Sequence, residues 1–246
     1  MVLKIIKLNA IDSTNNYLKQ LAREIDPEDL TVVLAQHQTS GRGQRGNSWS
    51  STAGESLALS IFKRFARLEA GQQFQISAAV SLAIIEAIKD FELPEVTIKW
   101  PNDIMSAKKK IGGILIENVL DQAFVKYSIV GIGLNVNQNA LPNLPQASSM
   151  RLQNRGQAFD LEEVFQKLLP RIGGRLNNLS KQDFTGIKRD YENNLFRRNE
   201  ISVFENPDGK RFNGIIKGVS LIGELLVETE MDPLKKFQLK DVKLIY

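Results

Sequence analysis

Apolar residues recur along the first hundred positions at two different spacings. Residues 4–8 alternate between apolar and polar, which predicts a strand, and residues 17–25 repeat their apolar positions at helical spacing. The same helical spacing predicts a second helix over residues 74–89. Uninterrupted apolar runs predict further strands at residues 32–35, 57–62 and 96–100. Strands interleaved with helices predict an α/β (α+β) fold, in which helices pack on a mixed sheet.

The second half of the chain changes its period. Apolar runs predict three more strands, at residues 114–119, 125–129 and 131–136. Apolar residues then recur at helical spacing over residues 160–179 and on to residue 195. After residue 195, the spacing between apolar residues falls from near four to two. A proline and glycine turn at residues 206–209 predicts a hairpin. We therefore expect two domains, residues 1–195 with the mixed sheet and residues 196–246 as a small antiparallel barrel.

Composition excludes several kinds of chemistry. The chain has no cysteine and one histidine, so disulfides, thiolate metal sites, a cysteine nucleophile and multi-histidine metal sites are all excluded. His37 follows an apolar run, which favours a side chain at a strand end over a catalytic base. The net charge of +4 suits an anionic small molecule or an acidic protein partner. No signal-peptide or membrane-spanning run is present in the sequence, so we expect a cytoplasmic protein without a membrane partner.

One segment is rich in glycine and arginine. Residues 41–49, the glycine-arginine loop, read Gly-Arg-Gly-Gln-Arg-Gly-Asn-Ser-Trp. Glycines let backbone N–H groups approach a ligand, and arginine supplies a fork of donors that stays charged, so the composition suits an anion cradle. Taken alone, however, this composition is just as typical of a mobile turn, of a segment that contacts RNA or of a nucleotide-binding loop.

Four further polar clusters lie at ends of predicted strands, where open sheets bind ligands. Singly, each is more typical of a helix cap, an Asx turn or a bulge; in particular, residues 12–15 offer side chains that would cap the first helix. The clusters occupy residues 12–15, 99–103, 110–115 and 131–135.

Together with the glycine-arginine loop, in this order, the clusters resemble those of the biotin protein ligases, also called biotin–(acetyl-CoA-carboxylase) ligases. The resemblance covers nearly the whole chain from Asp12 onward and is highly specific. It implies a catalytic domain of the biotin/lipoate ligase type followed by an SH3-like barrel. Because the Ser-Thr-Asn turn begins at residue 13, we expect the form without an N-terminal DNA-binding domain.

The resemblance also implies roles for individual residues. Arg42 and Lys110 would be the catalytic cations, and Asp103 would bind Mg²⁺. Biotin would be bound by Ser13, Thr14, Asn15, Gln38, Gly41, Arg42, Lys110 and Gly113. ATP and the adenylate would be bound by Gly43, Gln44, Arg45, Trp49, Asn102, Asp103 and Asn135.

The implied activity joins a carboxylate to ATP. Biotin would become biotinyl-5′-AMP, which a lysine of a biotin carboxyl carrier protein domain would then attack. Fixed cations would offset the repulsion between the two anions, and the glycine-arginine loop, mobile when empty, would close over the adenylate. The family commonly has a second basic residue where this chain has Gln44. We therefore expect the adenylate to escape from the site more readily than in a relative with arginine at this position. The sequence does not decide whether two copies of the chain pair through a sheet edge to form a homodimer.

Two other functions are compatible with parts of the sequence. A lipoate or octanoate protein ligase shares the fold, but its transferases use a cysteine that this chain lacks, and its arginine and glycine signature is not found. A nucleic-acid-binding module would use the glycine-arginine loop and Lys108 to Lys110 against phosphates. Such modules usually interleave aromatic with basic residues, and only Trp49 and Trp100 lie near the clusters. We therefore expect no nucleic-acid partner.

Overall fold

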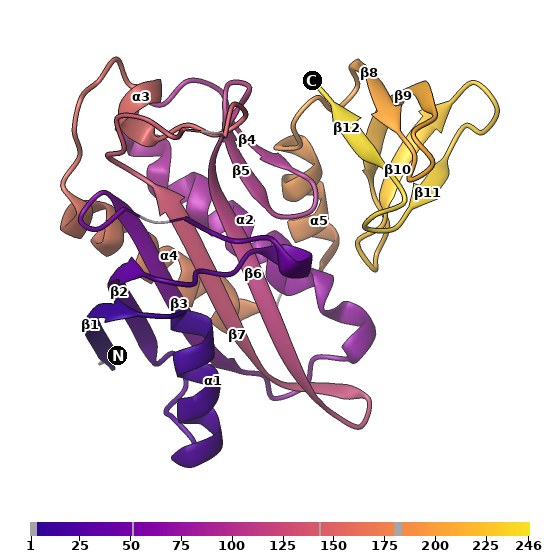
Figure 1. Ribbon diagram of the computed structural model, residues 1–246. Helices are drawn as coiled ribbons and strands as arrows, with labels where there is room; N and C mark the ends of the chain where they lie inside the picture. The colour runs from indigo at the N-terminus through magenta and orange to yellow at the C-terminus, as the bar shows by residue number, and fades with distance from the viewer. Residues whose placement is uncertain (1–3, 51, 143, 180–183) are drawn as a thin grey trace.

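The structure, a computed structural model, describes residues 4–50, 52–142, 144–179 and 184–246, except for the side chain of Arg45 (Figure 1). The α-helices are α1 (Thr14–Glu24), α2 (Phe74–Ile88), α3 (Met150–Gln153), α4 (Leu161–Asn178) and α5 (Phe184–Asn193). The strands are β1 (Ile5–Ile11), β2 (Val32–Gln38), β3 (Ser56–Arg64), β4 (Val96–Lys99), β5 (Asp103–Ser106), β6 (Lys109–Asp121), β7 (Phe124–Asn135), β8 (Ile201–Glu205), β9 (Arg211–Val219), β10 (Leu225–Thr229), β11 (Lys235–Phe237) and β12 (Lys243–Ile245).

Seven strands form the mixed sheet that the sequence predicts, in the order β1-β2-β3-β7-β6-β5-β4. Only β1 and β2 are parallel, and all other neighbours are antiparallel. The expectation of separate strands at 125–129 and 131–136 is wrong, because both belong to β7. Gly131 does not interrupt the strand: it keeps register with Ser60 on one side and Leu115 on the other.

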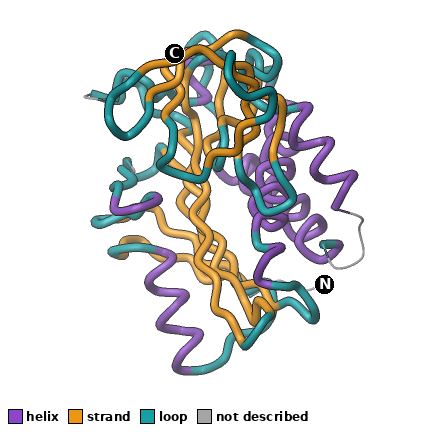
Figure 2. The backbone as a smooth tube through the Cα atoms, turned by 90° about the vertical axis from the view of Figure 1, so that its right-hand side faces the viewer, coloured by secondary structure: helices purple, strands orange, loops and turns teal. Residues whose placement is uncertain are grey.

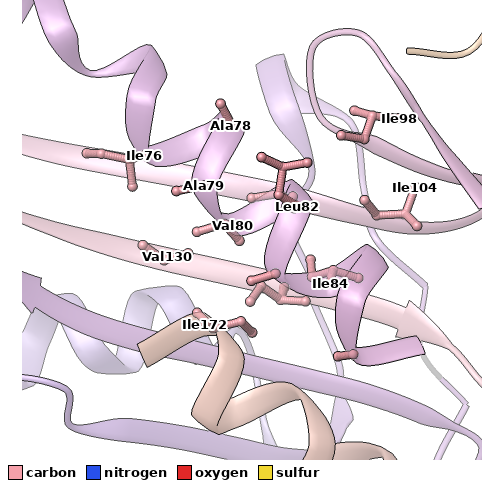
Figure 3. Packing of buried hydrophobic residues seen from close by; sticks show 14 of the residues in the cluster. Ile76, Ala78, Ala79, Val80, Leu82, Ile84, Ile98, Ile104, Val130 and Ile172 are labelled. Carbon is pink, nitrogen blue, oxygen red and sulfur yellow. The ribbon is translucent and has the colours of Figure 1, made fainter. Parts of the chain in front are cut away.

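The helices cover the two faces of this sheet unequally. Figure 2 shows the strand layer with most helices on one side and the long helix α1 on the other. Helix α2 is buried along nearly its whole length because it lies between the sheet and α4. Figure 3 shows its apolar side chains meeting Ile98 and Ile104 from the sheet and Ile172 from α4. A smaller cluster, around Leu18 and Phe62, joins α1 to the opposite face.

Five antiparallel strands form the second sheet, in the order β11-β10-β9-β8-β12. The antiparallel arrangement is consistent with an SH3-like domain, but β11 and β12 remain open edges, so the described residues form no closed barrel. The domain division at residue 196 stays a prediction.

Specific contacts join the second sheet to the rest of the protein. The Trp100 indole N–H, beside the end of β4, donates to the Gly223 carbonyl at 2.9 Å. The Glu192 carboxylate of α5 accepts from the Val219 N–H at 2.9 Å. None of the helices in the described part of the chain is long and apolar enough to cross a membrane.

Candidate active site

The polar clusters meet at one cleft. Residues from the start of α1, the end of β2, the glycine-arginine loop and the paired strands β6 and β7 surround it. The predicted site residues that line it are Thr14, Gln38, Arg42, Gly43, Gln44, Trp49, Asn102, Lys110 and Gly113.

Gln38 and Thr14 are bonded to each other at one end of the cleft. The Gln38 Oε1 accepts the Thr14 N–H at 2.8 Å and lies 3.1 Å from its hydroxyl. Ser13 occupies the N-cap position of α1, but its side chain makes no capping hydrogen bond, so the expectation of side-chain capping is wrong for Ser13. A helix leaves its first N–H groups unpaired, and here an amide from the neighbouring strand satisfies one of them.

Asn15 is buried behind the cleft and does not line it. Its Oδ1 accepts from the Ser60 hydroxyl at 2.6 Å, and its Nδ2 donates to the Glu117 carboxylate at 2.8 Å. Gly131 makes room for it, because a Cβ there would lie 2.3 Å from the Asn15 Oδ1. Asn15 therefore fastens α1 to the sheet.

The glycine-arginine loop folds back on itself as a narrow hairpin. The Gly43 N–H donates to the Asn47 carbonyl at 2.7 Å, and the Trp49 N–H donates to the Gly41 carbonyl at 2.9 Å. A Cβ on Gly41 would lie 2.4 Å from the Trp49 carbonyl oxygen, so the close approach requires glycine.

The Trp49 indole fills much of the cleft. A Cβ on Gly133 would lie 2.3 Å from its ring, and one on Gly113 would lie 3.5 Å away, so the two glycines form a flat floor for the ring. About 50 Å³ of the cleft is left, which is room for a few water molecules. The indole Nε1 is buried and has no hydrogen-bond partner among the described residues. A ligand of nucleotide size therefore enters only if Trp49 moves.

Arg42 is half-exposed at the mouth of the cleft. Its guanidinium donates to the Asn16 Oδ1 at 3.0 Å and lies 3.9 Å from the Glu117 carboxylate. Glu117 also accepts from Lys19 and thus faces two cations. Sequence reasoning missed Glu117, although a carboxylate within the apolar run of residues 114–120 was a usable signal.

Lys110 and Asp103 form an ion pair at the opposite wall. The Lys110 Nζ lies 2.6 Å from the Asp103 Oδ1, and the Lys99 Nζ lies 3.7 Å from its Oδ2. Lys110 lines the cleft, whereas Asp103 lines an adjoining cavity. Next to it, the Asn102 Nδ2 donates to the Ile114 carbonyl at 2.6 Å, which ties the end of β4 to β6.

Tyr191, in helix α5, is bonded to the segment that precedes Asp103. Its hydroxyl donates to the Pro101 carbonyl at 3.1 Å. Burial, and secondarily the negative charge of Asp103, raise the pKa of the Tyr191 phenol, so it stays a neutral donor.

Other predicted site residues lie outside the cleft. Asn135 is buried and turns away, since its Nδ2 donates to the Ser148 carbonyl at 3.0 Å. Ser13 and Gly41 are buried beside the cleft without lining it. The side chain of Arg45 lies outside the described part of the structure.

A glycine-floored cleft with Arg42 at its mouth and Lys110 on one wall suits an enzyme that brings two anions together. The model of the biotin/lipoate A/B protein ligase family matches residues 8–135. The chain therefore belongs to the biotin/lipoate A/B protein ligase family.

Within this family the chain is similar to biotin ligases over most of its length. It is 32% identical to the bifunctional ligase/repressor BirA of Bacillus subtilis, across 96% of this chain and 72% of the relative. It is 30% identical to the biotin–(acetyl-CoA-carboxylase) ligase of Mycobacterium tuberculosis, across 88% of this chain and 80% of the relative. The biotin protein ligase of Aquifex aeolicus, solved with biotin and ATP, superposes with a TM-score of 0.80 at 29% identity, covering 98% of each chain.

Proposed function

We propose that this protein activates biotin with ATP as biotinyl-5′-AMP and transfers the biotinyl group to a lysine of a biotin carboxyl carrier protein domain. The observation that carries the proposal is the single cleft lined both by neutral polar groups, Thr14 and Gln38, and by the cations Arg42 and Lys110. A neutral ring bearing a carboxylate matches this combination of neutral and cationic groups. The full-length similarity to biotin ligases supports the same choice.

In the first step a carboxylate oxygen of biotin attacks the α-phosphorus of ATP, and pyrophosphate leaves. Two unit charges 4 Å apart near a protein surface repel by about 4 kcal/mol. Lys110 and Arg42 offset this repulsion and stabilise the charge that develops on the phosphoryl oxygens. For this, Lys110 exchanges its Asp103 partner for the ligand, and Arg42 leaves Asn16.

In the second step the neutral amine of the acceptor lysine attacks the carbonyl carbon of the mixed anhydride, and AMP leaves. No protein nucleophile is needed, which agrees with a chain that has no cysteine. Positioning and exclusion of water carry the catalysis. We assign closure over the anhydride to the glycine-arginine loop, because Arg42, Gly43 and Gln44 line the cleft.

The remaining site residues receive roles that we propose from their positions. Thr14 and Gln38 face the biotin ring, Gly113 lets it approach the sheet, and Ser13, Asn15 and Gly41 support them from behind. We propose that the nucleotide is bound by Gly43, Gln44, Arg45, Trp49, Asn102 and Asn135. Asn135 would act indirectly, through the Ser148 backbone carbonyl to which its side chain is bonded.

Mg²⁺ is proposed as the metal cofactor, at Asp103. The described residues contain no cluster of three or more acidic or histidine side chains that could hold a metal by themselves. Asp103 alone fits the usual Mg²⁺ site, which uses one or two carboxylates and completes its coordination with substrate phosphates and water. Bound there, the metal would neutralise phosphate charge.

Partners and location are further proposals. Strand β1 pairs only with β2 in its sheet and leaves an open edge, which is the surface that a homodimer would use. We also propose a cytoplasmic location. The acceptor is proposed as the carrier domain of a biotin-dependent carboxylase.

Exchange of labelled pyrophosphate into ATP tests the proposal. Exchange that depends on biotin and Mg²⁺, with none for lipoate or octanoate, is the expected result. Exchange with lipoate or octanoate alone would assign the chain to the other branch of the family. Tight, strongly salt-dependent RNA binding without exchange would replace the ligase by a nucleic-acid-binding module.

A further inference from the structure

A buried chain of hydrogen bonds runs behind the cleft from Glu117 to Thr14. The Glu117 carboxylate accepts from the Asn15 Nδ2 at 2.8 Å, and the Asn15 Oδ1 lies 2.6 Å from the Ser60 hydroxyl. The hydroxyl oxygens of Ser60 and Thr14 lie 2.7 Å apart. Thr14 lines the cleft, whereas Asn15 and Ser60 are buried and do not line it. Two buried side chains therefore reach the cleft through a single hydroxyl.

The surroundings of the Asn15 amide fix its orientation. Its Nδ2 faces two groups that can only accept, the Glu117 carboxylate at 2.8 Å and the Leu115 backbone carbonyl at 3.4 Å. The reversed amide would set its oxygen against both of them. The Oδ1 therefore faces Ser60, and because this oxygen can only accept, the Ser60 hydroxyl donates to it.

The direction of the next hydrogen bond follows, because a hydroxyl has one proton. The Ser60 hydroxyl gives its proton to Asn15 and cannot also donate to Thr14. Two hydroxyl oxygens 2.7 Å apart attract each other only if one donates, so the Thr14 hydroxyl donates to Ser60. The competing acceptor, the Gln38 Oε1, lies further away at 3.1 Å and already accepts the Thr14 N–H. The Thr14 oxygen consequently presents lone pairs, and not its proton, to the cleft.

We propose that Ser60 is a positioning residue for substrate specificity, which holds the Thr14 hydroxyl as an acceptor and so selects a ligand with an N–H at that point of the cleft. The inference rests on the proposed function and names the part of the substrate that is selected. The biotin ring is a cyclic urea with two N–H donors, one of which would meet the Thr14 oxygen. A ring oxygen in that place would set two acceptors against each other. Lipoate and octanoate have no N–H and would leave the Thr14 oxygen unpaired.

Binding of biotin and of two isomeric analogues tests the proposal. In each analogue a ring oxygen replaces one of the two ureido N–H groups, and titration calorimetry gives each Kd. Wild type should bind at least one isomer about tenfold more weakly than biotin, because two acceptors then meet at Thr14. In Ser60→Ala the Thr14 hydroxyl can turn and donate to the ring oxygen, so the preference for biotin over that isomer should fall to about twofold. Circular dichroism checks that the variant is folded.

A double-variant cycle separates this role from a general loss of rigidity. Thr14→Val keeps the shape of the side chain without the hydroxyl, and it should weaken biotin binding about fivefold. Ser60→Ala should add nothing in that background, because its effect passes through the missing hydroxyl.

Ser128→Ala is the matched control. Ser128 is a buried serine of β7 in the same sheet, its hydroxyl donates to the Asn118 Oδ1 at 2.5 Å, and it does not line the cleft. This variant should leave the Kd of biotin and the preference over both isomers unchanged. An undiminished preference in Ser60→Ala overturns the inference, as do additive losses in the double variant. Absence of biotin-dependent pyrophosphate exchange in wild type would instead refute the proposed function itself.

Discussion

Adding a methyl group at Gly131 perturbs the packing behind the cleft in a way that can be calculated. The Cβ of Gly131→Ala would lie 2.3 Å from the Asn15 Oδ1 and 2.9 Å from its Cγ, so the Asn15 amide must move. Moving it breaks the bond from the Ser60 hydroxyl and the bond to the Glu117 carboxylate. A neutral hydrogen bond contributes about 1 kcal/mol and one to a charged group about 1.5–3 kcal/mol, so stability should fall by about 2.5–4 kcal/mol.

Urea unfolding followed by circular dichroism measures this loss, with an unchanged m-value expected. If Asn15 is the obstacle, Gly131→Ala in an Asn15→Ala background should cost less than about 1 kcal/mol. Gly174→Ala is the control, because its added Cβ meets nothing within 4 Å in helix α4. It should stabilise the protein by about 0.5–1 kcal/mol, through backbone entropy. An equal loss for Gly131→Ala in both backgrounds would show that the clash with Asn15 is not its cause.

Three further predictions concern the cleft. Lys110→Ala should remain folded and lose about 10²–10³ in adenylation rate, measured by pyrophosphate exchange, and full activity would remove Lys110 from the mechanism. Gln44→Arg should slow the release of biotinyl-AMP about fivefold, because a charged donor replaces a neutral one; unchanged or faster release contradicts this. Gly133→Ala should displace Trp49 and expose its indole to acrylamide quenching, with Gly71→Ala, where a Cβ meets nothing within 4 Å, as control. Unchanged quenching would mean that the ring does not rest on Gly133.

The strands and helices of the mixed sheet were predictable wherever a single apolar period lasted long enough. Strand β5 was missed because its residues, Asp103–Ser106, form a strand only through pairing with β4 and β6. The apolar runs predicted a break at residue 130, but β7 is continuous there, and Gly131 serves the packing of Asn15. In both cases tertiary contacts outweigh local preference.

The composition of the site was predictable, but the direction of its side chains was not. The polar clusters at strand ends do converge on one cleft, as the sequence indicated. Asn15 and Asn135 belong to those clusters yet turn into the protein, towards Ser60 and Ser148. An amide can satisfy its bonds in either direction, so only the surrounding partners decide which way it points.

The side chains of the site are engaged with neighbouring groups, and this affects how binding should be understood. Lys110 is paired with Asp103, Arg42 is bonded to Asn16, and the Trp49 indole rests on the glycine floor. When a ligand binds, these side chains must give up their present contacts for contacts with the ligand. The net binding free energy is therefore smaller than the sum of the new contacts. Trp49 differs from the other two, because its buried Nε1 has no partner to lose among the described residues. A ligand that offers that N–H an acceptor removes the cost of leaving it unpaired, about 1–3 kcal/mol. Release of Trp49 therefore gives up packing on the glycine floor but, unlike release of Lys110 or Arg42, breaks no hydrogen bond of its side chain.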